Sequence, residues 1–196
     1  MRKKFLHNIS LAVIICSLIP ILGVGCKHTY TPKPLGYHRI DFPEKEYTTY
    51  QTDCPFEFEY PVYGKIEQDF ESQETCWFNI RFPEFNGVLH MSYKLVDDNL
   101  DEYTEDARKL TFKHTIKAEV IDESVFTDEV HDVYGMLFKV KGNAASAIQF
   151  YVTDSLNHFL RGSLYFNAEP NKDSLAPVID FFTEDIVHFM ETVRWE

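Results

Sequence analysis

Hydrophobic and polar residues alternate along much of the chain, and this alternation predicts β-strands. In PFEFEYP, residues 55–61, the side chains of Phe56, Phe58 and Tyr60 share one face, and the glutamates between them point the other way. Successive side chains of a strand point to opposite sides of its sheet, so a period of two is typical of a half-buried strand. The same alternation occurs in the segments 76–82, 88–95, 118–126, 135–142, 147–154 and 158–166. A few turn-type residues separate the last two segments, which predicts a hairpin.

Two other segments have the spacing of amphipathic helices. The first covers about residues 99–118, with Asp98 or Asn99 as its cap and acidic residues in its first turns. The second covers about residues 174–194, with Ser174 as a natural N-cap. Its apolar stripe consists of Val178, Phe182, Ile186, Phe189 and Val193. Six or more strands, mostly connected by hairpins, and two helices predict the α+β class on an antiparallel β-sheet.

The N-terminus has the pattern of an export signal. Basic residues at positions 2–4 precede an apolar run that ends in LGVGC at Cys26. This ending resembles the lipobox of bacterial lipoproteins, although Leu22 stands four residues before the cysteine rather than three. We therefore expect Cys26 to carry the lipid, palmitate included, that anchors the protein to a membrane. The sequence divides into a lipoprotein signal peptide (1–25), a tether (26–35) and one globular α+β domain (36–196).

The charge balance argues against nucleic acid as a partner. The chain has a net charge of −12, and removing residues 1–25 takes away three basic residues and leaves −15. Binding to nucleic acid depends on neutralising phosphates with basic residues, so a body this acidic is poorly suited to it.

Two cysteines remain once Cys16 leaves with the signal peptide and Cys26 takes the lipid. They are Cys54 and Cys76, an even pair in a compartment that oxidises thiols. A disulfide between them would contribute about 3 kcal/mol in the chain-entropy model. The alternative is a pair of buried, unbonded thiols.

Three stretches resemble the gliding motility lipoprotein GldD family. They are PKPLGYHRIDFPEKEY behind the lipobox, CPFEFEYP around the first cysteine of the pair, and the tail from His158 to Trp195. The resemblance implies a membrane-anchored component without enzymatic activity, required for gliding and for type IX secretion. Its expected partners are other motility and secretion lipoproteins and membrane components. The order of strands and helices also looks like the PsbP-type α/β sandwich.

The resemblance also suggests where the protein faces and which segment it uses. Some lipoproteins of gliding bacteria carry acidic residues directly after the lipidated cysteine as a surface-export signal. No acidic run follows Cys26, which favours an anchor facing the periplasm and leaves inner or outer membrane open. The distinctive GYHRIDF core makes Tyr37, Arg39, Asp41 and Phe42 a candidate recognition segment.

The familiar catalytic motifs are missing from the sequence. It has no G-x-S-x-G elbow, no H-E-x-x-H, no C-x-x-C and no glycine-rich phosphate loop. His131 and Asp132 are adjacent, but neighbouring strand residues face opposite ways and cannot easily act together. We therefore expect no enzyme, no cofactor and no metal site.

The strand alternation gathers polar and aromatic side chains on the sheet face opposite the apolar one. The candidates are Trp77, Arg81, His90, Tyr151 and, if the register places it there, Arg161. Such a face offers a site for a carboxylate or for an acidic loop of a partner. This raises a competing hypothesis, a periplasmic module that binds a small ligand such as a glycan or an acidic metabolite. The alternative is a face that is solvated or covered by the N-terminal segment.

The triplet Asp-Ser-Leu occurs twice and suggests O-glycosylation at Ser155 and Ser174. Turns and helix caps independently favour Asp and Ser at such places, so the motif has a structural explanation as well.

Overall fold

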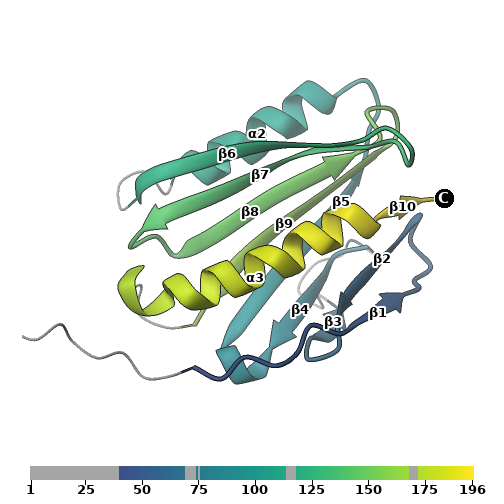
Figure 1. Ribbon diagram of the computed structural model, residues 1–196. Helices are drawn as coiled ribbons and strands as arrows, with labels where there is room; N and C mark the ends of the chain where they lie inside the picture. Colours follow the sequence, from purple (N-terminus) through teal and green to yellow (C-terminus); the bar gives the residue numbers. More distant parts are fainter. Residues whose placement is uncertain (1–39, 69–73, 75, 114–117, 168–171) are drawn as a thin grey trace, which may run out of the picture. The chain divides into compact units, whose positions relative to one another are not determined.

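Seven antiparallel strands form the main sheet of the protein (Figure 1). The computed structural model describes residues 40–68, 74, 76–113, 118–167 and 172–196. In spatial order the strands are β3 (Lys65–Gln68), β4 (Phe78–Phe82), β5 (Gly87–Leu95), β9 (His158–Phe166), β8 (Ser146–Thr153), β7 (Val133–Gly142) and β6 (Ala118–Asp128). Most neighbours in this order are also neighbours in sequence, as hairpin connections require. The predicted α+β class on an antiparallel sheet is confirmed.

A second, three-stranded sheet consists of β1 (Tyr47–Tyr50), β2 (Phe56–Pro61) and β10 (Arg194–Trp195). Strand β2 lies in the middle and pairs with the other two. The alternation of PFEFEYP correctly predicts β2. The pairing of β10 with β2 brings the C-terminal end of the chain next to the first described strands.

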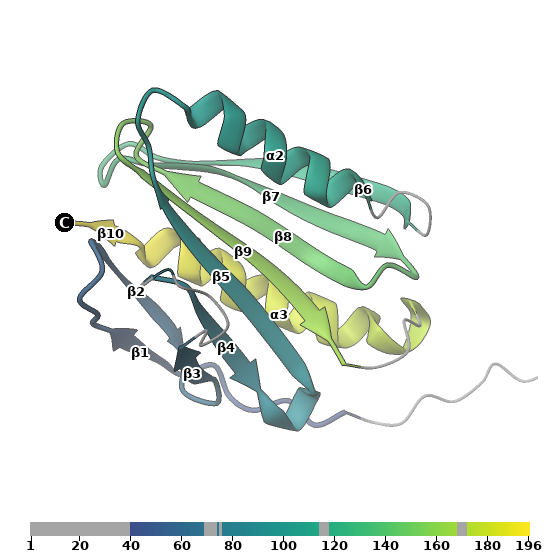
Figure 2. The same ribbon diagram turned by 180° about the vertical axis from the view of Figure 1, so that it is seen from behind.

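The helices lie on opposite faces of the main sheet. Helix α3 (Lys172–Thr192) and the small sheet cover one face, and α2 (Leu100–Phe112) lies across the other (Figures 1 and 2). A short 3-10 helix, η1 (Pro83–Phe85), joins β4 to β5. Among the described residues, no helix combines the length and the apolar character needed to cross a membrane.

Three helix boundaries differ from the prediction. The first helix ends at Phe112, and Ala118, placed in the helix by its sequence pattern, starts β6 because it pairs with Gly142 of β7. The second helix begins at Lys172, so Ser174 lies in its first turn and is not the N-cap. The same helix ends at Thr192, since Arg194 pairs with Glu57 in the small sheet.

Helix α3 supplies the core between the two sheets. All five residues of its predicted stripe are buried. The ring of Phe189 lies 4.5 Å from that of Phe58 in the small sheet, and the ring of Phe182 lies 4.5 Å from that of Phe82 in the main sheet. Aromatic pairs at such distances add to the gain from burying their surface. One helix therefore joins both sheets through a continuous aromatic core.

The centre of the main sheet depends on a glycine. A Cβ atom built on Gly162 of β9 would lie 2.2 Å from the ring of Phe150, which no real contact allows. The glycine lets this ring lie against the neighbouring strand and reach Phe189 of α3, at a ring distance of 5.4 Å.

Candidate functional site

Backbone pairing brings polar side chains of four strands together on the face that α2 crosses. Directly paired residues of neighbouring strands point to the same side of a sheet. One row contains Asn79, His90, Ser163 and Gln149, and the next contains Ser92, Arg161 and Tyr151. The register thus places Arg161 on the polar face, which the sequence left open.

Helix α2 covers part of this face. Its buried residues are Ala107 and Thr111, and the hydroxyl of Thr111 donates a hydrogen bond to Gln149 Oε1 on β8, 3.3 Å away. Near the start of the helix, the ring of Tyr103 lies 5.5 Å from that of Phe159 on β9. The predicted alternatives were a solvated face or one covered by the N-terminal segment. In the structure, the internal helix α2 partly covers it.

A groove of about 270 Å³ remains between α2 and strands β5 and β9. Its polar and aromatic lining includes Trp77, His90, Lys94, Tyr103, Asp106 and Arg161. Lys94 lies 4.5 Å from the centroid of the Tyr103 ring, a cation–π distance. The groove therefore combines two basic residues, several aromatic side chains and one acidic residue on the helix.

Arg161 is the half-buried charge of this groove, and its one side-chain partner in the described part of the chain is neutral. Its Nη2 donates to Gln149 Oε1 at 2.5 Å, and among the described residues it forms no ion pair. Burial lowers the pKa of Arg161, because a guanidinium is harder to charge away from water. Arginine titrates so far above neutral pH that the group still remains a cation.

Two buried polar atoms on the same face have no hydrogen-bond partner in the described part of the chain. They are Gln149 Nε2 and Ser163 Oγ, and their residues are direct partners between β8 and β9. The oxygen of the Gln149 amide accepts from both Thr111 and Arg161, whereas its nitrogen has no acceptor among the described residues. Buried polar groups are normally paired, and an unpaired one costs about 1–3 kcal/mol.

The structure brings three of the five predicted face residues together. Trp77, His90 and Arg161 all line the groove. Arg81 lies on the same face but outside the groove, where its Nε donates to Glu67 on β3. Tyr151 packs in the layer under α2, with its ring 5.3 Å from that of Phe159, and burial raises its pKa.

A second polar cluster lies on the opposite face, around the carboxylate of Asp185 on α3. Lys45 Nζ donates to its Oδ1 at 2.7 Å, and the hydroxyls of Tyr47 and Tyr63 donate at 3.0 Å and 2.5 Å. Burial, followed by the charge and hydrogen bond of Asp185, raises the pKa of both tyrosines. We did not predict this cluster. One feature of the sequence could have indicated it: Asp185 is an acidic residue within the apolar stripe of the helix, three residues after Phe182.

The candidate recognition segment joins the domain at Phe42. Its ring stacks on Phe181 of α3 at 4.5 Å and on Phe85 of η1 at 5.9 Å. Asp41 is described and is also engaged in an interaction. Tyr37 and Arg39 lie outside the described residues, as do Cys26, the signal peptide and the tether.

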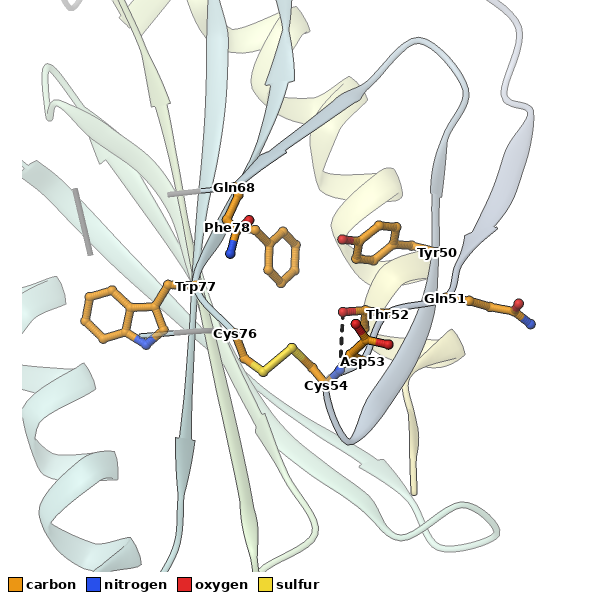
Figure 3. Close-up of a pocket in the computed structure, with 9 residues that line it drawn as sticks. All are labelled: Tyr50, Gln51, Thr52, Asp53, Cys54, Gln68, Cys76, Trp77 and Phe78. Carbon is orange, nitrogen blue, oxygen red and sulfur yellow. Dashed lines mark hydrogen bonds between the residues drawn. A yellow bond between two sulfur atoms is a disulfide. The ribbon is translucent and has the colours of Figure 1, made fainter. Parts of the chain in front are cut away.

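The predicted disulfide is present between Cys54 and Cys76, with their Cα atoms 5.8 Å apart. It links the loop before β2 to the residues before β4, and so ties the small sheet to the main sheet. A pocket of about 720 Å³ lies beside it. Figure 3 shows the rings of Tyr50 and Phe78 on one side of strand β4, which begins at Phe78, and the ring of Trp77 on the other side. Asp53 is the one acidic side chain among the nine residues of this lining, and none of the nine is basic, which favours a structural cross-link.

The two serines proposed for glycosylation are both exposed. Ser155 lies in the turn between β8 and β9 with a positive φ of 67°. The Asp154 carboxylate holds this turn by accepting the backbone N–H groups of Leu156, Asn157 and His158. Ser174 lies in the first turn of α3. Modification of either serine stays a prediction.

In the structure, His131 pairs with Asp128 on the preceding strand end and not with its neighbour Asp132. The Nδ1 of His131 lies 2.7 Å from Asp128 Oδ2 in the turn between β6 and β7, and this hydrogen bond lowers the pKa of Asp128. Over the residues that the structure describes, no three His, Cys, Asp or Glu side chains lie close enough to hold a metal ion.

The fold and the groove define the class, an α+β domain with a polar sheet face that a helix partly covers. Comparison with known families then gives the particular family. A model of the gliding motility lipoprotein GldD family matches residues 27–195. The chain belongs to this family, as its resemblance predicted, and is a gliding motility lipoprotein. Membership of a lipoprotein family implies membrane anchoring.

Two further comparisons complete the picture. No curated protein matches the chain. Among solved structures, the chain aligns with the solution structure of cyanobacterial PsbP from Synechocystis sp. PCC 6803. The alignment has 13% sequence identity and a TM-score of 0.49, and it covers 84% of this chain and 100% of that chain.

Proposed function

We propose that this lipoprotein is a non-catalytic accessory factor of the gliding and type IX secretion apparatus. The observation that carries the proposal is the family match, which spans nearly all of the chain after Cys26. In this role, the protein supports the assembly or stability of other motility lipoproteins and of membrane components.

In this proposal the domain is held at a membrane by lipid on Cys26 and faces the periplasm. The disulfide supports that placement, since such bonds form and persist in oxidising compartments and are rare in the cytosol. The acidic balance of −15 after residue 25 supports protein partners over nucleic acid.

The recognition segment divides into two parts under this proposal. Phe42 anchors the segment to α3 and η1, whereas Tyr37, Arg39 and Asp41 supply the contacts with the partner. The packing of Phe42 supports this division, because it fixes the point at which the segment meets the domain.

Deletion in a gliding host tests the function. We expect colonies that no longer spread, reduced secretion of type IX substrates, and lower amounts of other motility lipoproteins in membrane fractions at unchanged transcript levels. Normal spreading together with normal secretion would refute the proposal. A Cys26→Ser variant separates anchoring from folding, because it should leave the domain intact and still fail to restore spreading.

Point variants test the recognition segment. The double variant Tyr37→Ala/Arg39→Ala should accumulate to the normal level and fail to restore gliding. Phe42→Ala is the matched control, and we expect it to lower the protein level by removing a partly buried aromatic stack. Full gliding by the double variant would show that these residues serve only as a spacer.

A further inference from the structure

Arg161 presents unused hydrogen-bonding capacity to the groove between α2, β5 and β9. A guanidinium carries a planar fork of N–H donors and no acceptor, and this shape matches a carboxylate. In the described part of the chain, a single hydrogen bond, to the neutral Gln149 amide, uses that fork. A half-buried cation with a neutral partner is well placed to bind an anion.

The charges that line the groove favour an anion with a single negative charge. Arg161 and Lys94 are basic, and Asp106 on α2 is acidic, so the lining has a net charge of +1 with His90 neutral. One carboxylate would balance this lining. A phosphate monoester carries close to two charges at neutral pH and would also lie near Asp106.

The walls of the groove favour a flat, apolar body attached to that carboxylate. Trp77, Tyr103 and Phe159 place three aromatic side chains along the lining. The volume of about 270 Å³ lies just below the usual range for ligand pockets, which begins at about 300 Å³. This size suits a small aromatic acid better than an oligosaccharide.

We propose that this groove is a carboxylate site, in which Arg161 binds the carboxylate and Trp77 and Tyr103 contact an aromatic group attached to it. Lys94 strengthens the binding by its charge, and Asp106 weakens it. This proposal does not rest on the proposed motility function. The two can fail separately, because binding is measured on purified protein and motility is measured in cells.

The first test uses the full-length lipoprotein in detergent and two matched probes, phenylacetate and phenylacetamide. The two molecules have nearly the same shape and differ in charge. Binding is measured by isothermal titration calorimetry and by ligand-observed NMR. We expect the acid to bind at least tenfold more tightly than the amide, because hydrogen bonds to a charged group are the stronger ones. Equal affinity for the acid and the amide would overturn the proposal.

The second test compares two arginines on the same sheet face. Arg161→Met should weaken phenylacetate binding at least tenfold, whereas Arg81→Met, outside the groove, should stay within twofold of the unchanged protein. Circular dichroism checks the fold of each variant.

If Arg161→Met does not fold, variants at Asp106 and Lys94, two exposed positions of the lining, test the proposal in its place. Asp106→Asn should tighten binding about threefold and Lys94→Met should weaken it about threefold, by removing exposed charges near the anion.

A third test distinguishes two sources of the same chemistry. The probe is N-acetyl-Ala-Ala-Phe, with either a free C-terminal carboxylate or a C-terminal amide. Binding of the free-acid peptide but not of phenylacetate would assign the site to the C-terminus of a protein. Binding of phenylacetate alone would assign it to a free small acid. If neither acid binds, the proposal is wrong.

Discussion

The two faces of the main sheet each hold a charge that is removed from solvent, fully for Asp185 and partly for Arg161, and the chain surrounds these charges differently. On the α3 face, Asp185 accepts hydrogen bonds from Lys45, Tyr47 and Tyr63. On the α2 face, Arg161 has one hydrogen bond, to a neutral amide, among the described residues. The first charge is neutralised within the fold, whereas the second faces a groove.

This difference separates structural charge from charge available for binding. A buried ion needs an opposite charge or a full set of hydrogen bonds to offset the loss of its hydration. Asp185 has both, and its partners connect the first described strand and the turn after β2 to α3. Arg161 has neither in full, so an anion bound from solution would offset its lost hydration and stabilise the folded protein.

The largest expected effect comes from removing Asp185. Asp185→Ala should lower the free energy of unfolding by about 4 kcal/mol, because it leaves Lys45 and two tyrosine hydroxyls without their acceptor. Urea unfolding followed by circular dichroism measures the change. Asp180→Ala, at an exposed position of the same helix, is the control and should stay within about 0.5 kcal/mol. A loss below about 1 kcal/mol would show that the cluster does not tie α3 to the N-terminal strands.

Removing the disulfide should have the next largest effect on the same side of the molecule. The double variant Cys54→Ser/Cys76→Ser frees a loop with a sequence separation of 22. We expect a loss of about 3 kcal/mol in the free energy of unfolding, chiefly through a less restricted unfolded chain. Calorimetry under non-reducing conditions gives the value. If the variant melts at the temperature of the parent, the link between the two sheets comes from α3 alone.

A single hydroxyl of the Asp185 cluster should have a smaller, pH-dependent effect. Tyr63→Phe removes the 2.5 Å hydrogen bond to Asp185 and should cost about 1.5 kcal/mol at pH 7. Tyr60→Phe is the control at that pH, since the hydroxyl of Tyr60 has no hydrogen-bond partner among the described residues. It should change stability by less than about 0.5 kcal/mol.

The same variant tests the raised pKa of Tyr63 in alkali. Burial and the hydrogen bond to Asp185 keep this tyrosine protonated in the folded protein above its usual pKa of 10. Above pH 10 the unfolded chain therefore binds fewer protons than the folded one, and stability falls as pH rises. Tyr63→Phe should reduce that slope by up to about 1.4 kcal/mol per pH unit. Parallel stability curves for variant and parent above pH 10 would contradict this account.

Periodicity predicted those parts of the fold in which local pattern and tertiary packing agree. The alternation of β2 and the apolar stripe of α3 are examples, because Phe56, Phe58 and all five stripe residues are buried and Tyr60 is partly buried against the same core. The short strands β1, β3 and β10 were not predicted. They have two to four residues each, too few for a period to show, and they exist because longer strands pair with them.

The polar sites depend on register and on long-range contacts, which a sequence pattern does not contain. Alternation placed Trp77 and His90 on one face, but only the pairing of Arg161 with Ser92 and Tyr151 brought the arginine to them. Helix α2 was expected from its pattern, yet nothing local indicated that it would form one side of a groove. The Asp185 cluster joins residues 140 positions apart in the case of Lys45, which explains why it was missed.

The smallest expected effect on stability provides the sharpest contrast between the two charges. Arg161→Met removes a cation that lacks an acidic partner and places an apolar side chain of similar length in the layer under α2. Replacing a buried charge in this way is often neutral or stabilising, while Gln149 loses one of its two donors. We expect these contributions to offset each other, so that the free energy of unfolding changes by less than about 1 kcal/mol. The measurement is urea unfolding under the conditions used for Asp185→Ala. A loss as large as that of Asp185→Ala would show that Arg161 is held by the fold as firmly as Asp185, and the distinction between a structural and an available charge would fail.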